Sequence, residues 1–312
     1  MLSSLLIFFC FLNPAHAKGV RADWSYAEKR LKAEGFKKSF IRDLKKNYET
    51  KDFSQVVELN LLLFLKKNDY HGVQINAKSV KDVKKFMDKN QSILQKTEKD
   101  HGVSASAIAS LLWVESRYGK NLGRFHVPSA YVHLVQAERP EVVAHLHRQA
   151  GRFTKTVSQA TFREITKRTR KKAAWAIDEL RAVQTMQASD GKTLKTLRGS
   201  FAGAFGMPQF IPSSFVHWAR PYKKGSVPNL VNSSDAVYSV GYYLSDSGWK
   251  RGQEKTYVPA LLRYNNSTDY ANAILKLASR VDSLPQRGPT AEENFQIPER
   301  DYLGEDPLNE QD

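Results

Sequence analysis

The stretch Ser104-Ala-Ser-Ala-Ile-Ala-Ser-Leu-Leu-Trp-Val-Glu-Ser-Arg-Tyr-Gly119 decides how the chain is interpreted, because it predicts a helix with a carboxyl group on its apolar face. Ile108, Leu111, Leu112 and Glu115 follow the i, i+3, i+4, i+7 spacing of one helix face. Glu115 should therefore point toward the interior with the leucines. A carboxyl group there loses hydration, which raises its pKa. A carboxyl that stays protonated near neutral pH can act as a general acid.

Glu115 also has an ordinary interpretation. A glutamate on an apolar helix face is most often paired with a cation, or lies at the rim with its carboxylate in water. The helix alone does not decide between a catalytic and a structural carboxyl. Gly119 is predicted to end the helix, because glycine readily adopts the left-handed conformation found after helix C-termini.

The first residues, Met1 to Ala17, have the pattern of a secretory signal peptide. An apolar core of about eight residues precedes the small-x-small sequence Ala15-His-Ala17, after which we expect cleavage and release into the periplasm. This core is too short to span a bilayer, and we expect no integral membrane segment elsewhere. The alternative is a buried N-terminal helix. Cys10 is the only cysteine, so the mature chain would have neither a disulfide nor a thiol nucleophile.

The chain is strongly basic. It has 48 Lys and Arg residues against 32 Asp and Glu residues, a formal net charge of +16 and a pI near 9.7. A charge of this size favours a polyanionic partner. The candidates are nucleic acid, anionic lipid, lipopolysaccharide and the acidic, peptide-bearing cell wall. Nucleic acid is disfavoured by the signal peptide and by the absence of a recognisable nucleic-acid-binding motif.

Helical periodicity dominates the chain and strand patterns are scarce, which predicts a mainly α fold with little β structure. Residues 18–283 are expected to form the catalytic body, and residues 284–312, rich in Pro, Glu and Asp, an acidic and disordered tail. Within the body, helical patterns are expected at 24–36, 40–48, 80–99, 234–246 and 270–281.

Residues 131–190 are polar and helix-prone, and we interpret them as a basic helical insertion. The densest part is Lys167-Arg-Thr-Arg-Lys-Lys172. Such a charge run is usually a solvated helix face. The alternative hypothesis is that it lies beside the functional site and attracts acidic peptide stems of the cell wall. A zinc site is not expected here, because His145-Leu-His147 is the only close histidine pair and no His-Glu-x-x-His pattern occurs.

A glycine-rich motif follows, Arg198-Gly-Ser-Phe-Ala-Gly-Ala-Phe-Gly-Met-Pro-Gln-Phe-Ile-Pro-Ser-Ser214. Its closely spaced glycines let the backbone approach a ligand. Ser200 and Gln209 could offer hydroxyl and amide groups to sugar hydroxyls and N-acetyl groups. The structural alternative is a tight turn before a Pro-Ser-Ser helix start.

Two aromatic motifs lie further along the chain. The segment from Ser234 to Leu244, which contains Tyr243, is either a core helix with buried tyrosines or part of a binding site. In Arg263-Tyr-Asn-Asn-Ser-Thr-Asp-Tyr270, the two tyrosines could stack on a sugar and Asn265 could hydrogen-bond it. The alternative for this motif is a helix start capped by Ser267 or Thr268.

The order and spacing of these segments closely resemble the B-type lytic murein transglycosylases, a family that cleaves peptidoglycan. The resemblance covers residues 24 to 283. It rests most on Val114-Glu-Ser-Arg-Tyr-Gly119, on the glycine-rich motif from Gly199 to Ser214, and on Tyr264-Asn-x-Ser-x-x-Tyr270. Membership would imply a lysozyme-like helical catalytic core with an additional helical region.

The resemblance also implies a chemistry. In this family a single glutamic acid, here Glu115, protonates the glycosidic oxygen between N-acetylmuramic acid and N-acetylglucosamine. It then accepts the proton of the muramoyl C6 hydroxyl, which closes a 1,6-anhydro ring without water. The substrate's acetamido group assists, so the second carboxylate of ordinary glycosidases is not needed. Sugar-binding roles carry over to Ser200, Gln209, Tyr243, Tyr264, Asn265 and Tyr270.

The chain departs from the family in two places. Many relatives carry an Asp-rich calcium loop, where this chain has Pro221-Tyr-Lys-Lys-Gly-Ser-Val-Pro-Asn229. Lysines and prolines cannot supply the oxygen ligands of calcium, so we expect no calcium there, and we expect no other cofactor. The stretch between Gly119 and Arg198 is also longer and more basic than usual.

Asp235 and Asp269 are interpreted as helix N-terminal residues, although either could still be a partner of the catalytic acid.

Three classes of function therefore stay open. The leading hypothesis is an exported lytic transglycosylase that acts on peptidoglycan glycan strands, with other cell-wall enzymes as a further candidate class of partner. A hydrolytic muramidase would use water and leave a reducing end. A noncatalytic peptidoglycan-binding protein would keep the groove and tolerate the loss of Glu115.

Overall fold

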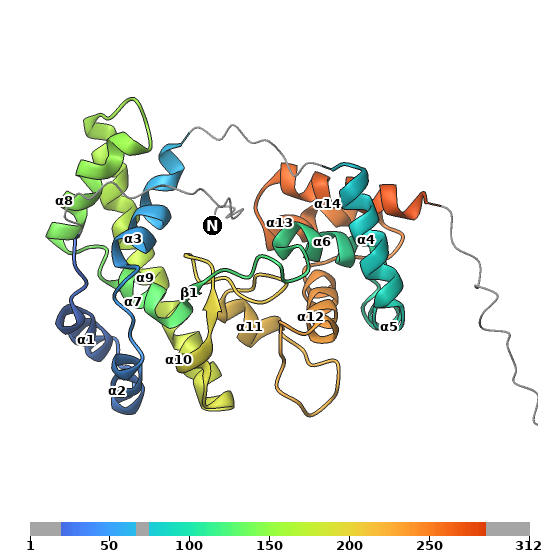
Figure 1. Ribbon diagram of the computed structural model, residues 1–312, viewed down its shortest axis with the longest axis horizontal. Helices are drawn as coiled ribbons and strands as arrows, with labels where there is room; N and C mark the ends of the chain where they lie inside the picture. Colours follow the sequence, from blue (N-terminus) through green and yellow to red (C-terminus); the bar gives the residue numbers. More distant parts are fainter. Residues whose placement is uncertain (1–19, 67–74, 285–312) are drawn as a thin grey trace, which may run out of the picture. The chain divides into compact units, whose positions relative to one another are not determined.

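The computed structural model describes residues 20–66 and 75–284, which fold almost entirely into helices (Figure 1). The predicted mainly α fold is therefore confirmed. The predicted signal peptide (1–17) lies outside the described residues, as does the predicted acidic tail apart from residue 284. Within the described part of the chain, no helix is both long and apolar enough to cross a membrane.

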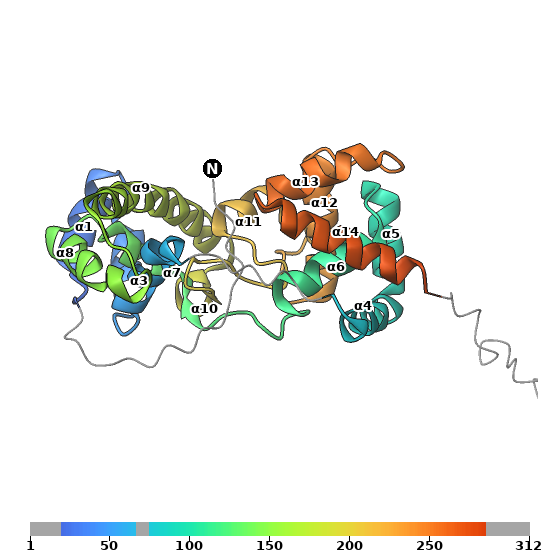
Figure 2. The same cartoon turned by 90° about the horizontal axis from the view of Figure 1, so that it is seen from above.

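Helix α6 (Ala105–Ser116) is the centre of one group of helices. It packs against α4, α5, α12 and α14, and every residue from Ser106 to Trp113 is buried. Figure 2 shows α14 lying along α6. The helices of this group are α4 (Ala77–Lys89), α5 (Gln91–His101), α12 (Ser233–Asp246), α13 (Tyr257–Tyr264) and α14 (Thr268–Asp282).

The other group is built on the buried helix α7 (Val127–Val135) and the long helix α9 (Gln159–Asp190). All nine residues of α7 are buried. The other helices of this group are α1 (Trp24–Ala33), α2 (Lys38–Lys46), α3 (Phe53–Leu62), α8 (Pro140–Gln149), α10 (Thr193–Thr196) and α11 (Pro212–Trp218). Three short 3-10 turns complete the described elements, at Leu63–Leu65, Ala150–Arg152 and Glu254–Thr256.

A two-stranded antiparallel sheet, β1 (Phe125–His126) with β2 (Arg198–Gly199), starts the glycine-rich segment. Phe125 lies opposite Gly199, and the approach beside this pair is very close. Gly123 has a φ of +84°, and a Cβ built there would lie 2.2 Å from the carbonyl carbon of Gly199. Glycine is required at this position for both its backbone conformation and its lack of a side chain.

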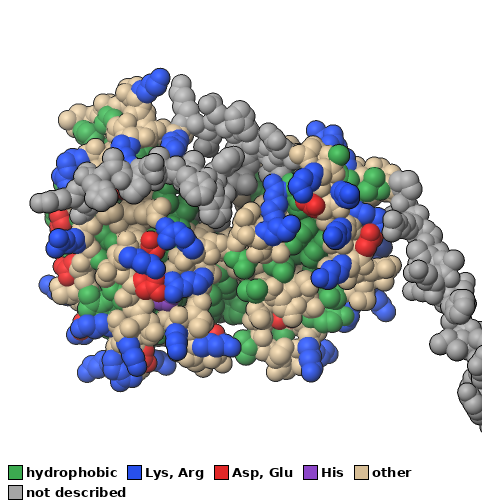
Figure 3. Space-filling model, viewed as in Figure 1, with side chains coloured by type: hydrophobic (Ala, Val, Ile, Leu, Met, Phe, Trp, Pro, Cys, Tyr) green, Lys and Arg blue, Asp and Glu red, His purple; other side chains and the backbone are tan. Residues whose placement is uncertain are grey.

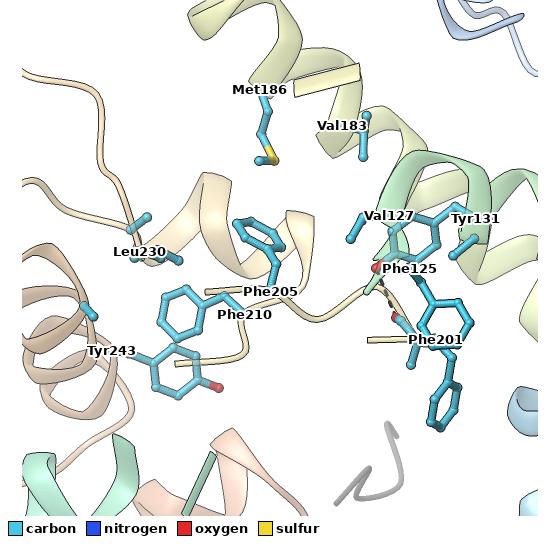
Figure 4. Packing of buried hydrophobic residues seen from close by; sticks show 14 of the residues in the cluster. Phe125, Val127, Tyr131, Val183, Met186, Phe201, Phe205, Phe210, Leu230 and Tyr243 are labelled. Atoms are coloured by element: carbon cyan, nitrogen blue, oxygen red, sulfur yellow. Dashed lines mark hydrogen bonds between the residues drawn. The ribbon is translucent and has the colours of Figure 1, made fainter. Parts of the chain in front are cut away.

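The glycine-rich segment lies between the two helix groups, and its aromatic residues belong to the hydrophobic core. Figure 4 shows Phe205 and Phe210 from that segment packed near Leu230 and Tyr243, and Phe201 near Phe125. These residues belong to one cluster of buried apolar side chains, which also includes α6 residues. Burial of such a cluster supplies the main favourable term for folding. The glycine-rich segment is thus anchored by its aromatic residues, while its glycines shape the backbone.

The expected single helix over residues 80–99 is two helices. Helix α4 ends at Lys89 and α5 begins at Gln91, with Asn90 between them at φ −118° and ψ 25°. The Asn90 side chain donates a hydrogen bond of 2.8 Å to the carbonyl of Phe86. The Phe86 carbonyl also accepts the Asn90 backbone amide at 3.0 Å, so Asn90 binds the end of α4 through both its backbone and its side chain.

The first part of the expected basic insertion is core. Residues 131–137 are all buried. Two of their polar members have internal hydrogen-bond partners: the His133 ring Nε2 lies 2.9 Å from the Glu49 carbonyl oxygen, and Gln136 donates to the Tyr48 hydroxyl at 3.0 Å. Buried polar groups are tolerated when they are hydrogen-bonded in this way. This part of the sequence contains polar residues but forms a buried core helix.

Candidate active site

Helix α6 ends one residue after Glu115, earlier than expected. Arg117, Tyr118 and Gly119 all have positive φ, at 53°, 58° and 85°. The hydroxyl of Ser116 organises this turn, because it accepts the Gly119 amide at 2.9 Å and donates to the Met207 carbonyl at 2.7 Å. The prediction that Gly119 ends the helix was wrong by three residues. The turn fixes the end of α6, and with it Glu115, against the glycine-rich segment.

The Glu115 carboxyl is partly buried and has one hydrogen-bond donor. The Tyr270 hydroxyl of α14 donates to Glu115 Oε1. Burial raises the pKa of Glu115 to about 7, and the hydrogen bond from Tyr270 acts in the opposite direction. No second carboxyl of the described residues contributes to this shift. The described surroundings therefore leave Glu115 as a single, weakly hydrated acid.

Tyr270 has a different place from the expected sugar-stacking one. Its side chain is fully buried, and its ring stacks on Tyr264 with centroids 6.4 Å apart and an interplanar angle of 15°. Burial raises the pKa of the Tyr270 hydroxyl well above its usual range, so this group remains a donor. A ring with no exposed surface cannot stack on a sugar in this conformation. Tyr270 instead orients Glu115.

Tyr264 is only partly buried and links the aromatic motif to the glycine-rich one. Its hydroxyl donates to the Pro208 carbonyl, and its ring lies 5.9 Å from that of Phe210. Next to it, Tyr243 is 7% exposed, and its hydroxyl donates to the Arg263 carbonyl at 2.8 Å. Burial raises the pKa of Tyr243 to about 12. The structure thus brings these two expected tyrosines together near Glu115's partner Tyr270.

Gln209 sits in the same segment with a strained backbone. Its φ is +52°, which is uncommon for a residue other than glycine. The amide nitrogen donates to the Gly206 carbonyl at 2.8 Å, whereas the Oε1 atom is buried without a partner in the described part of the chain. Asn265, at the end of α13, shows the same feature, since its Oδ1 atom is buried and unpartnered within that part. Both side chains retain an acceptor for a ligand.

Ser200 closes the glycine-rich turn. Its hydroxyl oxygen accepts the amides of Ala202 and Ala204 at 3.3 and 3.1 Å, and the residue is 2% exposed. The nearby Gly203 has a φ of +82°, and a Cβ there would lie 2.1 Å from the Tyr131 hydroxyl. The turn is therefore packed against α7. No contact joins Ser200 to Glu115 or to the tyrosines among the described interactions.

Asp235 is a structural carboxylate. Its two oxygens accept the amides of Tyr222 and Asn229 at 2.9 and 2.7 Å, which fixes both ends of the segment where the family resemblance would imply a calcium loop. The segment between them holds two lysines and no acidic residue. The residues present do not fit a calcium site, because hard cations require several oxygen ligands. The other open candidate, Asp269, is exposed in the first turn of α14, which Ser267 caps by accepting the Tyr270 amide at 3.3 Å.

Two members of the basic run on α9, Arg168 and Lys172, have partners within the protein. Arg168 pairs with Glu164 at 3.0 Å and lies over the Phe64 ring, and Lys172 lies over the Trp175 ring. Burial lowers the pKa of Lys172 to about 8. In Figures 1 and 2, α8 and the first half of α9 lie apart from α6. The run is therefore not beside Glu115, and Figure 3 shows Lys and Arg side chains dispersed over the face in view.

Two residues with clear roles were missed in the sequence. Ser116 directly follows Glu115 in the quoted stretch Val114–Gly119, so its position beside the candidate acid was available as a signal. Trp218, at the end of α11, packs its ring 4.6 Å from Tyr243 and donates to Asp246 at 2.8 Å. Only the fold brings α11 to this tyrosine, so no local pattern could have indicated it.

Solved structures define the class of fold. Lytic transglycosylase SLT35 of Escherichia coli, in complex with bulgecin A, superposes with a TM-score of 0.61 at 19% identity, over 83% of this chain and 91% of that one. Soluble lytic transglycosylase SltB1 of Pseudomonas aeruginosa gives the same TM-score and identity over 83% and 97%. The expected lysozyme-like helical fold is confirmed by this similarity.

Sequence comparison then gives the family. The chain matches the transglycosylase SLT domain over residues 19–260. It is also 25% identical over 169 residues to membrane-bound lytic murein transglycosylase B of Escherichia coli (strain K12), a match that covers 54% of this chain and 38% of that protein. The match thus spans well under half of that relative's length. The chain belongs to the transglycosylase SLT family, and its resemblance to the B-type lytic murein transglycosylases is confirmed.

Proposed function

We propose that the protein is a periplasmic lytic transglycosylase that cleaves the β-1,4 bond between N-acetylmuramic acid and N-acetylglucosamine in peptidoglycan. The observation that carries this proposal is the Glu115 carboxyl. It is partly buried, its pKa is raised to about 7, and one of its oxygens is held by Tyr270. An acid with this pKa is available in both protonation states near neutral pH, which one group needs to act first as acid and then as base.

The hydrogen bond from Tyr270 decides which oxygen carries the proton. Because the hydroxyl donates to Oε1, that oxygen acts as an acceptor and the acidic proton belongs on Oε2. Glu115 Oε2 would donate this proton to the glycosidic oxygen, and the C1–O bond of the muramoyl residue would break. The leaving N-acetylglucosamine then carries the proton as a hydroxyl group.

The second half of the reaction returns the proton. The muramoyl C6 hydroxyl attacks C1 and gives its proton to the Glu115 carboxylate, which closes the 1,6-anhydro ring. One C–O bond has formed and one has broken, and no water is consumed. A lone carboxyl suffices for this scheme if the substrate's acetamido group stabilises the positive charge at C1. The absence of a second carboxyl influence on Glu115, among the described residues, supports it.

Substrate recognition is proposed for the residues around this acid. The buried and unpartnered acceptors Gln209 Oε1 and Asn265 Oδ1 suit sugar hydroxyl or acetamido N–H donors. Tyr264 offers a partly exposed ring, and the Tyr243 ring packs edge-on against it. Ser200 could take part only through its own O–H, since its oxygen already accepts two amides. Tyr270 acts through Glu115.

The cell wall as substrate is supported by the relatives. SltB3 of Pseudomonas aeruginosa, with a TM-score of 0.60 at 16% identity over 83% of this chain and 78% of that one, was solved with NAG-anhNAM-pentapeptide. For this chain, peptidoglycan glycan strands are the proposed partner. Export with cleavage after Ala17 stays a proposal, and so does the periplasmic location. Nucleic acid is not part of the proposal.

Product analysis tests the proposed reaction. Purified mature protein would be incubated with peptidoglycan sacculi, and the released fragments would be measured by mass spectrometry. The proposal expects 1,6-anhydromuramoyl ends, which are lighter than hydrolysed ends by one water. Fragments with only reducing muramoyl ends would establish the muramidase alternative. No fragments, with sacculus binding retained, would establish the noncatalytic one.

A further inference from the structure

A pocket distinct from the Glu115 site lies between α8 and the first half of α9. Its charged wall is formed by Arg163, Lys167, Arg170 and Lys171, and His147 and Phe162 form another part of the lining. The two rings lie 4.6 Å apart, and the His147 Nε2 atom is 3.3 Å from the Thr166 hydroxyl. No carboxylate lines the pocket.

The four cations are arranged as one surface. Their positions follow i, i+4, i+7 and i+8 on α9, so they share a helix face with neighbouring side chains about 5–6 Å apart. All four are exposed, and none forms an ion pair or a side-chain hydrogen bond within the described residues. Arg168, by contrast, is neutralised by Glu164 at 3.0 Å. The pocket therefore concentrates positive charge that the protein itself does not compensate.

This combination selects the chemistry of a ligand. Two guanidinium groups can hold carboxylates in bidentate hydrogen bonds, and the two lysines add point charges. The Phe162 ring, together with the aliphatic parts of the long cationic side chains, offers apolar contact. A ligand with several carboxylates separated by short apolar groups satisfies both features. A flexible peptide with free carboxyl groups has this chemistry.

We propose that this pocket is a second binding site that takes the carboxylate-bearing peptide stems of peptidoglycan. This inference rests on the proposed function, because the polymer that Glu115 would cleave carries such stems. Binding at α8 and α9 would hold the polymer at a position apart from the reacting bond. The partner would thereby be engaged at two places, and the pocket would favour stem-bearing glycan over glycan without stems.

The test compares two charge-matched variants. In the first, Arg163, Lys167, Arg170 and Lys171 are all replaced by Gln. In the control, Lys29, Lys37, Lys38 and Lys46 are replaced by Gln, which removes the same charge from four exposed lysines on or beside α1 and α2. Both are made with Glu115→Gln, so that the wall is bound without being degraded. Binding is measured by co-sedimentation with intact sacculi and with sacculi whose stems have been removed enzymatically.

The proposal expects the pocket variant to bind intact sacculi about tenfold more weakly than the control, since several exposed ion pairs are lost together. On stem-free sacculi the two variants should bind alike. Equal binding of both variants to intact sacculi would overturn the proposal, as would an equal loss on stem-free sacculi. Binding of both variants to double-stranded DNA at physiological salt is measured in parallel. If the pocket variant loses only DNA binding, the proposal is overturned and the pocket is assigned to nucleic acid.

Two controls keep the result interpretable. Melting temperatures of both variants should match, because the replaced side chains are exposed. Cleavage of sacculi by the wild-type chain is scored separately by mass spectrometry. If the wild type does not cleave but the pocket variant still loses stem-dependent binding, the proposed reaction fails and the pocket stands.

Discussion

Burial raises the pKa of two glutamates in the described part of the chain, but the two carboxyl groups differ in their hydrogen bonds. Glu179 on α9 is 2% exposed, and both of its oxygens are used, since the Ser213 amide donates at 2.9 Å and the Ser213 hydroxyl at 2.7 Å. Glu115 on α6 is only partly buried and receives one hydrogen bond, from Tyr270. Burial raises the pKa of both carboxyl groups.

Glu179 is a structural carboxyl, whereas Glu115 is the proposed catalytic one. A raised pKa does not distinguish the two, because burial has the same effect on each. Unused hydrogen-bonding capacity does distinguish them. Glu179 is saturated by the start of α11 and joins that helix to α9, whereas Glu115 keeps Oε2 free for a substrate.

Glu115→Gln should give the largest effect. Lysis should fall by about 10²- to 10⁴-fold, because an amide can neither donate nor recover the proton. The change is nearly isosteric, so the circular dichroism spectrum should be unchanged. Lysis is followed by the turbidity of sacculi. Activity close to that of wild type would remove Glu115 from the mechanism.

The same variant should gain stability relative to wild type as pH rises. A carboxyl whose folded pKa is raised contributes stability at low pH and loses it between its unfolded value of 4.5 and its folded value of about 7. Glutamine does not titrate. Urea unfolding at pH 5 and pH 8 measures the difference. A difference in unfolding free energy that is independent of pH would show that burial does not raise the Glu115 pKa.

Tyr270→Phe should have an intermediate effect. The Tyr270 hydroxyl orients Glu115, and its hydrogen bond lowers the pKa of that carboxyl. Without the hydroxyl, the pKa of Glu115 should rise further. Hydrogen bonds to charged groups contribute about 1.5–3 kcal/mol, so a rate loss of roughly tenfold or more is expected. The pH profile of the variant should also shift to higher pH. A rate loss with an unshifted profile would indicate a purely structural role.

Glu179→Gln should affect stability and leave lysis by the folded protein unchanged. Glutamine offers one acceptor oxygen, so either the amide or the hydroxyl of Ser213 loses its partner. A cost of about 1–3 kcal/mol is expected at low pH. Because burial raises the pKa of Glu179, this difference in unfolding free energy should become smaller as pH rises above the ordinary glutamate value of 4.5. Chemical denaturation measures it. Loss of lysis without loss of stability would break the comparison with Glu115.

Calcium should have no effect. Like Glu179, Asp235 has hydrogen bonds to both carboxylate oxygens, in this case from two backbone amides. Neither addition of calcium nor a chelator should change the melting temperature in differential scanning calorimetry. A clear upward shift with calcium would reveal a site formed by other residues.

The sequence predicted those features that depend on local spacing. The i+7 position of Glu115 after Ile108 indicated a buried acid, and the structure places it beside Tyr270. Two helices of the C-terminal half were also predicted closely, since α12 begins at Ser233 where 234 was expected and α14 spans Thr268–Asp282 where 270–281 was expected. Each of these features depends on helical periodicity or on a short motif.

What could not be predicted depends on contacts between distant segments. The end of α6 is set by Ser116, whose partner Met207 is 91 residues away. The core helix α7 was assigned to a basic insertion, because the sequence does not show that Glu49 and Tyr48 lie within hydrogen-bond distance of His133 and Gln136. The burial of Tyr270 likewise follows from how α14 packs on α6, which no local pattern encodes.

The central claim, that Glu115 acts as a lone acid with a raised pKa, is tested most directly by the pH dependence of kcat/KM on a short soluble glycan. The acid must be protonated in the free enzyme, so activity should be present below pH 7 and lost as pH rises through the Glu115 pKa of about 7. One descending limb centred at this pH is expected. A limb centred near the ordinary glutamate value of 4.5, or no descending limb between pH 5 and pH 9, would contradict it.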